Sequence, residues 1–442
     1  MMELLRSSSH SDRQVSHGFQ APLVDSGSRG RPNYNITREQ LTFLKSCGFT
    51  TKVMAEVMNV SVRTIKRRIR KFQLGRSYAD LTDAALDDLV QQTVVGNDLI
   101  GPESVRASLR SQGINIQRRR VRDSMIRINP SSAAFRALSN RPQRRSYQVA
   151  GPNSLWHLDG NHKLIRWRIV IHGAVDGFSR LILFLQASNN NRSSTVLSAF
   201  VRAIARYGPP SRVRTDRGGE NNSVCAMMNI FRGHDRGSAL RGRSTHNQRI
   251  ERLWRDLWRG MTNVYYDLFH FLESEGIIDA DNEMHIWALH YVYLPRINRD
   301  LQGFIGTWNH HGLRTEHHLT PTQSFVRGYL QQQRRQTTAM QDMFGTAQGR
   351  HSSTTTVVPQ EEAPATSDLE SARRTGTSTS GTNDQLLDWP ERVTVPPVDC
   401  AVPEELMDQI TAQFDPLGGD RADYGLHILT RLILFLESAA VV

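Results

Sequence analysis

Hydrophobic residues recur at helical spacing through residues 34–75, the first part of the chain with a regular pattern. Thr37 and Gln40 stand three residues apart, as in a capping box at the start of a helix. Further along, Ile65 and Ile69 fall on one helix face, and basic residues gather on the other: Arg63, Lys66, Arg67 and Arg70. The pattern predicts a helix-turn-helix unit whose third helix lies in a DNA major groove. A three-helix bundle with a solvated basic face is the alternative.

A second helical pattern covers residues 79–130. The stretch "GPESVRASLRSQG" carries Pro102 in its first turn and stops at Gly113. The last helix of this unit is again basic, with Arg118, Arg119, Arg120 and Arg122 close together. Two such units in tandem are suited to hold a longer stretch of duplex. Residues 1–33 and 131–150 lack periodicity and are expected to form a disordered arm and a basic linker.

From residue 151 the pattern becomes that of an α/β fold. Three apolar stretches joined by short Gly, Asn and Ser turns predict strands, and an amphipathic helix follows and ends at Gly208. A fourth short strand and a second amphipathic helix complete the series. This order predicts a mixed sheet flanked by helices over residues 151–330. Residues 221–244, between the fourth strand and the second helix, are rich in Arg and Gly and are expected to form a mobile loop.

The last third of the chain divides into two segments. Residues 331–385 are polar and of low complexity, which predicts a disordered linker. Residues 386–442 regain apolar residues in "PEELMDQITAQF" and "YGLHILTRLILFLES". These stretches predict helices, either as a small cap on the preceding domain or as helices that bind a partner.

Charge is distributed unevenly along the 442 residues. The net charge is +12, but residues 1–150 hold 25 Lys and Arg against 12 Asp and Glu, and residues 351–442 hold 5 against 15. Two basic regions followed by an acidic tail favour a polyanionic partner, most simply double-stranded DNA. A soluble basic enzyme without such a partner is the alternative.

Cysteine usage and hydropathy bear on the compartment. The three cysteines are far apart and form no C-x-x-C pair, which favours a reducing compartment and excludes a zinc finger. The longest apolar run is interrupted by Arg431 and is too short to span a bilayer, so no membrane association is expected. The basic clusters at 66–71 and 118–120 are suited to be nuclear localisation signals, although DNA-contacting helices share this composition. In a eukaryote we expect a nuclear protein.

Three acidic residues stand at positions that predict a metal site. Asp159 lies within the first strand, Asp216 at the end of the fourth strand, and Glu251 in the first turn of the second amphipathic helix. Adjacent strands and a covering helix bring such residues together, and a cluster of carboxylate oxygens suits two Mg²⁺ or Mn²⁺ ions. Each residue also has a purely structural interpretation. Asp159 could pair with Lys163 or Arg166, Asp216 could be a turn residue, and Glu251 could pair with Arg255.

The spacing of these residues carries a resemblance to a known family. There are 56 residues between Asp159 and Asp216, and 34 between Asp216 and Glu251. Residues 150–330 resemble the retroviral-type integrase core, the DDE transposase and integrase family with a ribonuclease H-like fold. The matching pieces are "WHLDGNHK", "IHGAVDGFSRLILFLQAS", "RTDRGGEN", "HNQRIERLWRDLWRG" and "WNHHGLRTEHHLTPTQSF".

The resemblance implies an activity and a set of roles. It implies that Asp159, Asp216 and Glu251 are the catalytic, metal-binding triad of an enzyme that cleaves DNA and transfers DNA strands, and that the protein self-associates. We expect the basic residues near the triad to hold DNA phosphates: Arg214, Arg217 and Arg249. His157 and His162 either orient the substrate or are ordinary strand residues. Two further acids, Asp176 and Glu220, are interpreted as a strand-end turn residue and a loop residue.

The sequence also departs from the retroviral pattern. The zinc-binding His-His-Cys-Cys domain that usually precedes this core is replaced by the helix-turn-helix units. That arrangement is more similar to a cut-and-paste transposase or to a cellular gene derived from one. The alternative to an active enzyme is therefore a domesticated DNA-binding protein that keeps the fold without transposing.

Overall fold

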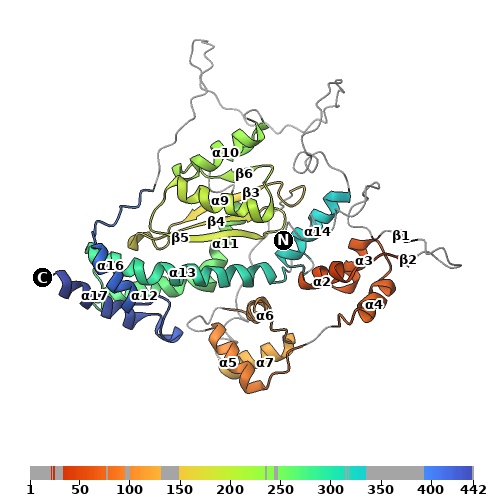
Figure 1. The fold of residues 1–442 in the computed structure, drawn as a ribbon, viewed down its shortest axis with the longest axis horizontal. Helices are drawn as coiled ribbons and strands as arrows, with labels where there is room; N and C mark the ends of the chain where they lie inside the picture. The colour runs from red at the N-terminus through yellow and green to blue at the C-terminus, as the bar shows by residue number, and fades with distance from the viewer. Residues whose placement is uncertain are drawn as a thin grey trace, which may run out of the picture.

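The structure is a computed structural model that describes residues 21, 23–24, 33–75, 78–94, 100–130, 149–233, 236–242, 247–313, 316, 318–334 and 393–440. Its centre is a mixed five-stranded sheet in the order β5-β4-β3-β6-β7. Strands β3 (Trp156–Asn161), β4 (Val170–Asp176) and β5 (Ile182–Ser188) pair antiparallel, whereas β6 (Val213–Thr215) and β7 (Ala239–Arg241) continue the sheet in parallel. Figure 1 shows this sheet between two layers of helices.

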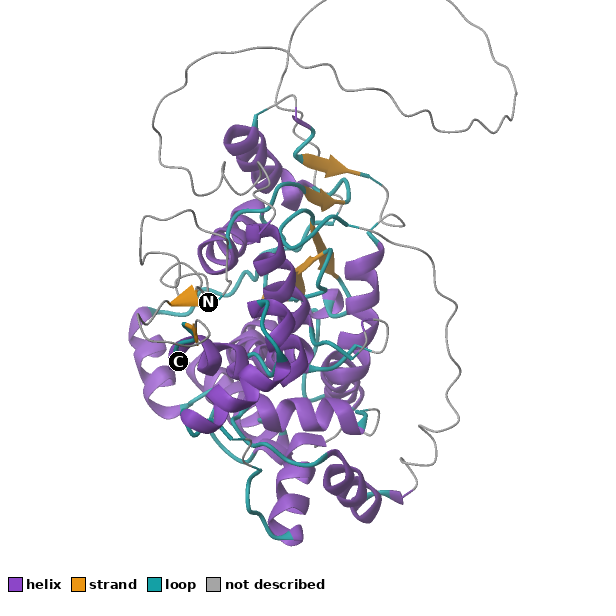
Figure 2. Ribbon diagram, turned by 90° about the vertical axis from the view of Figure 1, so that its right-hand side faces the viewer, coloured by secondary structure: helices purple, strands orange, loops and turns teal. Residues whose placement is uncertain are grey.

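Both faces of the sheet are covered by helices, and most residues of its three long strands are buried. One face packs against α9 (Ser193–Tyr207) and α10 (Asn222–Arg232), with Phe200 and Trp156 ring to ring at 5.5 Å. The other face packs against α11 (Gln248–Leu257), α12 (Asn263–Ser274) and α13 (Glu283–His310). Helices α11 and α12 are joined by a π-helical turn at Trp258–Thr262. Figure 2 shows the strands enclosed by helices in a second view.

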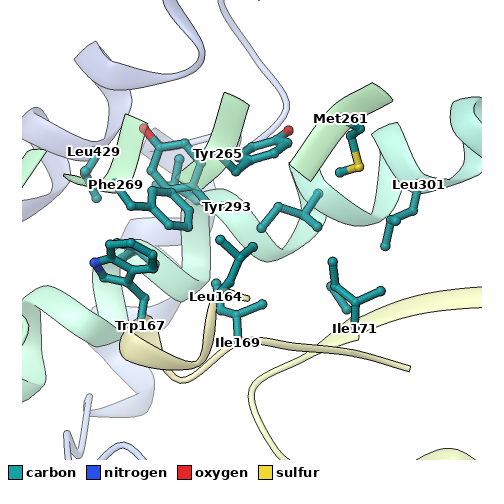
Figure 3. Close-up of a cluster of buried hydrophobic side chains, with 14 of the residues drawn as sticks. Leu164, Trp167, Ile169, Ile171, Met261, Tyr265, Phe269, Tyr293, Leu301 and Leu429 are labelled. Atoms are coloured by element: carbon teal, nitrogen blue, oxygen red, sulfur yellow. The ribbon is translucent and has the colours of Figure 1, made fainter. Parts of the chain in front are cut away.

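The largest hydrophobic cluster lies on the α13 face and includes the C-terminal segment. Trp167, Phe269 and Tyr293 are fully buried and meet edge to face, and Leu429 of the last helix joins them (Figure 3). That helix, α17 (Leu426–Ala440), and α16 (Glu404–Gln413) pack on α12 and α13. Helices α16 and α17 therefore pack on the central domain, and a role in binding a partner stays a prediction.

The first helical unit contains α2 (Arg38–Ser46), α3 (Thr51–Met58) and α4 (Val62–Lys71), preceded by short strands β1 (Leu23–Val24) and β2 (Asn33–Tyr34). Its turns follow the sequence signals: Thr37 and Gln40 form the capping box, and Asn59 adopts the left-handed conformation with φ of 53°. Its core is completed by α14 (Pro321–Arg334), which follows α13 and contributes Val326 and Tyr329.

The second helical unit contains α5 (Asp83–Val94), α6 (Pro102–Ser111) and α7 (Arg118–Ile128), with a small apolar core of its own. Helix α6 packs against α13 of the central domain. Pro102 stands in the first turn of α6, as the sequence predicts.

Two parts of the chain differ from the expectations. Residues 221–244 were expected to form a mobile loop, but α10 and β7 occupy much of this stretch, because Val224, Cys225 and Met228 pack on the sheet. Helix α14 continues to Arg334, past the expected start of the linker. The predictions for 1–33, 131–150 and 331–385 fall almost entirely outside the described residues. No helix in the described ranges has the length and hydropathy needed to cross a membrane.

Candidate metal and nucleic-acid site

Strand pairing brings Asp159 and Asp216 side by side, toward the C-terminal ends of the parallel strands β3 and β6. In the parallel pair of β3 and β6, Trp156 is opposite Val213 and His157 is opposite Arg214. Continuing this register by two residues sets Asp159 opposite Asp216, one residue beyond the end of β6. The order and offset of the strands thus give the juxtaposition that the sequence predicts.

Glu251 reaches the same edge because Asn247 fixes the start of α11 on β3. The Asn247 Nδ2 donates to the backbone oxygen of Leu158 at 2.8 Å, which turns its Oδ1 toward Nδ1 of His157, 2.5 Å away. Since an amide oxygen only accepts, the imidazole carries its proton on Nδ1. Burial lowers the pKa of His157 to about 4, so the ring is neutral at pH 7. Glu251 follows Asn247 by one turn, and its backbone N–H donates to the Asn247 oxygen.

The three carboxylates act on one another electrostatically. The pKa of Asp159 is raised to about 7, mainly by burial and then by the negative charges of Asp216 and Glu251, against a hydrogen bond from Trp254. The pKa of Glu251 is also raised, first by burial and then by the charge of Asp216. These repulsions show that the carboxylates are neighbours, and a bound cation would relieve them.

The side chains around Asp159 and Asp216 offer carboxylate oxygens and an imidazole nitrogen as donors to a metal ion. Throughout the described ranges, no three His, Cys, Asp or Glu side chains are arranged closely enough to share a metal ion. The chemistry of the carboxylate oxygens nevertheless fits Mg²⁺ or Mn²⁺. The buried Nε2 of His162 has no hydrogen-bond partner in this part of the structure, and the charge of Asp216 acts on its ring. The donors therefore fit a hard cation, and the carboxylates would have to approach one another to share it.

The purely structural interpretations of Asp159 and Glu251 are not what the structure shows. Asp159 accepts a hydrogen bond from the indole Nε1 of Trp254 at 2.9 Å, and Arg166 pairs instead with Glu273 at 2.9 Å. Among the described ion pairs there is none between Glu251 and an arginine of its own helix. Among the ion pairs of the described residues, neither the Asp159 nor the Glu251 carboxylate takes part.

Asp216 is a turn residue as well as a member of the acidic cluster, which consists of Asp159, Asp216 and Glu251. Its Oδ1 accepts hydrogen bonds from the backbone N–H of Gly218 and from Nδ2 of Asn221, each at 3.1 Å. The same Nδ2 lies 3.2 Å from Oε1 of Glu220. Asn221 thus joins two carboxylates, and one of them was not expected at the site.

Glu220 was interpreted as a loop residue, and this interpretation was wrong. It lies in a short 3-10 helix, Gly219–Asn221, and only 4% of its surface is exposed. A Cβ on Gly218 would lie 2.2 Å from the Glu220 carboxylate, so the "GG" of this turn makes room for the buried acid. The two glycines before Glu220 are the sequence feature that could have indicated a closely packed turn there.

Asp176 agrees with its interpretation as a strand-end turn residue. It is fully buried at the far end of β4, opposite Trp156. It accepts hydrogen bonds from the backbone N–H of Asn153 and from the N–H and hydroxyl of Ser179. Burial raises its pKa to about 6. These contacts fix the turn between β4 and β5 and do not involve the acidic cluster.

A large cleft of about 2060 Å³ opens beside Glu251, between the second helical unit and the central domain. Glu251 and Arg255 of α11, four residues apart, line one wall together with Arg259 of the π-helical turn that follows. Arg106 and Arg110 of α6 line the other wall, also four residues apart. The cleft therefore has arginines on both walls and includes Glu251 in its lining.

The basic residues predicted to contact DNA differ in availability. All four on α4 are exposed. On α7, three of the four arginines are engaged within the second unit: Arg118 with Glu103, Arg119 with Asp123 and Arg120 with Asp83. Near the acidic cluster, the positive charges of Arg214 and Arg249 act on His157, and Arg217 is exposed beside Asp216.

Comparisons with known proteins concern the central domain. Residues 146–339 match a family model described as integrase core domain. The HTLV-2 integrase catalytic core domain in complex with magnesium (trimeric form) is 19% identical with a TM-score of 0.25, over 39% of this chain and 97% of that one. The simian T-cell lymphotropic virus intasome in complex with PP2A regulatory subunit B56 gamma is 17% identical with a TM-score of 0.30, over 54% and 72%. Comparison with curated proteins gave no match.

Proposed function

We propose that the chain, whose residues 146–339 match a family model described as integrase core domain, is a metal-dependent polynucleotidyl transferase that cleaves DNA and transfers DNA strands. The observation that carries the proposal is the mutual electrostatic effect of Asp159, Asp216 and Glu251 at one edge of the sheet. Carboxylates whose negative charges raise the pKa of their neighbours are costly to hold together, and a bound cation would relieve this cost.

In this mechanism Asp159, Asp216 and Glu251 would hold two Mg²⁺ or Mn²⁺ ions, which supply activation of the attacking oxygen and stabilisation of the leaving one. In the first step water attacks phosphorus, and in the second step a DNA 3′-hydroxyl attacks phosphorus. In each step the bond between phosphorus and the leaving 3′-oxygen breaks. The chain itself binds and orients the DNA. Arg214, Arg217 and Arg249 stand beside the carboxylates, where they can hold backbone phosphates.

The rest of the chain supplies further DNA contacts in this proposal. The exposed basic face of α4 fits the recognition helix of a helix-turn-helix unit in a major groove. The basic cleft between α6 and α11 gives a duplex a path to Glu251. Double-stranded DNA is then the partner, and we also propose self-association and a nuclear location in a eukaryotic cell.

The function is tested by strand transfer on a labelled DNA duplex with Mn²⁺. The wild-type protein is expected to join labelled strands, and Asp216→Asn and Glu251→Gln are expected to reduce the rate by a factor of 100 or more, on the order of one lost catalytic interaction. Arg206→Ala is the control, because Arg206 is exposed on α9, on the other face of the sheet. Equal rates in the wild type and both acidic variants would contradict the proposal.

A domesticated DNA-binding protein that keeps the fold is the second candidate. It is favoured by the finding that, over the described residues, the carboxylates are not arranged as the ligands of a metal ion. The two candidates differ in one outcome of the same assay. A protein that binds duplex tightly and shows no strand transfer with Mg²⁺ or Mn²⁺ supports domestication.

A further inference from the structure

The indole of Trp254 connects two members of the acidic cluster. Trp254 is on α11, three residues after Glu251, and its Nε1 donates to Oδ2 of Asp159 at 2.9 Å. One hydrogen bond thus ties the carboxylate on β3 to the helix that carries Glu251. The ring is 8% exposed, so this N–H has little access to water as an alternative partner.

The sheet is built to receive this ring. Gly173 of β4 is paired with Asp159 across the two strands. A Cβ on Gly173 would lie 2.7 Å from Cη2 of Trp254 and 2.7 Å from a methyl group of Leu185. Any larger residue at this position would push the indole away from the sheet. The glycine therefore lets the ring settle deeply enough to reach Asp159.

Glu251 lies between two points at which α11 is hydrogen-bonded to β3. Asn247, four residues before it, bonds to His157 and Leu158, and Trp254, three residues after it, bonds to Asp159. Trp254 shares the apolar contacts of α11 with three residues that are almost completely buried: Ile250, Leu253 and Leu257. Apolar packing alone would be met by phenylalanine at position 254. Packing does not account for the N–H group of the indole, whereas its hydrogen bond to Asp159 does.

We propose that Trp254 is a positioning residue whose N–H group holds the Asp159 carboxylate at a fixed place relative to Glu251. This inference rests on the proposed function, because the separation of the two carboxylates matters only if they share metal ions. Hydrogen bonds from outside the ligand set orient metal ligands, and losing one typically weakens metal binding by about 10- to 100-fold.

Trp254→Phe is the variant that separates positioning from packing. It keeps most of the ring in the space above Gly173 and removes the N–H group. Trp308→Phe is the matched control, because the Nε1 of Trp308 makes the same kind of bond, to the backbone oxygen of Arg180 at 2.9 Å, away from the acidic cluster. Gly173→Ala is a second test variant, which keeps the indole N–H and displaces the ring.

The readout is binding of Mn²⁺ alone to the full chain, measured from the electron paramagnetic resonance signal of free Mn²⁺. Trp254→Phe and Gly173→Ala are expected to raise the Kd for Mn²⁺ by about 10-fold or more, and Trp308→Phe to leave it unchanged. Thermal unfolding and DNA affinity in EDTA are measured on the same samples. DNA affinity in EDTA is expected to be close to wild type in Trp254→Phe, and the unfolding temperature is expected to fall modestly, because one buried hydrogen bond is lost while most apolar contacts remain.

The outcomes separate this inference from the function on which it rests. Wild-type affinity for Mn²⁺ in a folded Trp254→Phe protein would overturn the positioning role and leave the proposed function intact. Mn²⁺ binding that is equally weak in the wild type and in Asp216→Asn would overturn the proposed function, and the positioning role with it. If Trp254→Phe does not fold, a wild-type Kd in Gly173→Ala would overturn the inference.

Discussion

The side-chain amide of Asn247 makes its hydrogen bonds to strand β3 alone, one with His157 and one with the backbone oxygen of Leu158. Both partners are buried, so water cannot replace the amide if it is removed. The lowered pKa of about 4 keeps the His157 ring neutral near pH 7, with its one proton on Nδ1 facing the Asn247 oxygen. A buried network of this kind fixes the start of α11 and therefore the position of Glu251.

Removing that amide is expected to cost stability. Asn247→Ala removes the hydrogen bonds to Nδ1 of His157 and to the backbone oxygen of Leu158, which predicts a loss of about 1–3 kcal/mol in the free energy of unfolding. Urea unfolding followed by far-ultraviolet circular dichroism measures it. Asn189→Ala, at an exposed asparagine after β5, is the control and is expected to stay within about 0.5 kcal/mol of wild type. Equal losses in both variants would argue against the network.

At this scale the sequence predicts some site residues and not others. Asp159, Asp216 and Glu251 were predicted from their spacing and from the elements that carry them, because those strands and that helix have clear patterns in the local sequence. Trp254 was not predicted as a site residue, since its bond to Asp159 spans 95 residues and depends on how α11 docks. Glu220 was missed because its burial comes from the packing of the whole turn, which the local sequence does not show.

Among the elements, α4 and α7 have similar basic sequences but different surroundings. The apolar residues of α4 face the first unit, and its four predicted DNA-contacting residues are exposed. In α7 the arginines form ion pairs within the second unit, and Arg120 also donates to the backbone oxygen of Leu81 at 2.5 Å. A guanidinium engaged in this way must break existing contacts before it can bind a phosphate. Composition alone cannot distinguish the two helices.

This difference predicts unequal effects on DNA binding. Arg67→Ala on α4 is expected to weaken duplex binding and to reduce the slope of log K against log salt concentration by about 1, as one phosphate contact is lost. Arg120→Ala on α7 is expected to leave that slope unchanged and to lower the unfolding temperature. Fluorescence anisotropy of a labelled duplex between about 50 and 200 mM salt measures both. A larger change in slope for Arg120→Ala would contradict this assignment.

Helix α10 and strand β7 illustrate why an element can be missed. Val224, Cys225 and Met228 are buried at helical spacing, so the signal for α10 was present beneath the Arg and Gly residues of the stretch. Strand β7 has only three residues, too few for an alternating pattern to be visible. It exists because its backbone pairs with β6, a contact that sequence periodicity does not encode.

The whole molecule is held together by contacts between distant segments. Gln323 of α14 donates to the backbone oxygen of Gly48 at 2.7 Å across 275 residues, and Arg327 pairs with Glu56. The first helical unit thus shares its core with a helix of the central domain. No local pattern reveals such sharing, which explains why the sequence showed the helices of this unit but not the surface that supports them.

The C-terminal segment returns to the central domain through Glu283. Arg168 holds both oxygens of this carboxylate, at 2.6 and 2.7 Å, and the backbone N–H of Asp399 donates to it at 2.8 Å. Arg168 also reaches the backbone oxygen of Pro397. The pKa of Glu283 is lowered to about 2, mainly by the hydrogen bond with Arg168 and then by the Asp399 N–H group. The ionised carboxylate therefore anchors the chain that leads into α16.

The pH dependence of this anchor has a definite sign. Because the folded-state pKa lies below the usual value of 4.5, the stabilisation is complete above pH 4.5 and is lost as the pH falls toward 2. Glu283→Gln is expected to lower the urea midpoint at pH 7 and to speed amide exchange at residues 397–400, and this difference from wild type should shrink between pH 4.5 and 3. Glu275→Gln, at an exposed position after α12, is the control. A difference that stays constant from pH 7 to pH 3 would show that the carboxylate charge does not hold the segment.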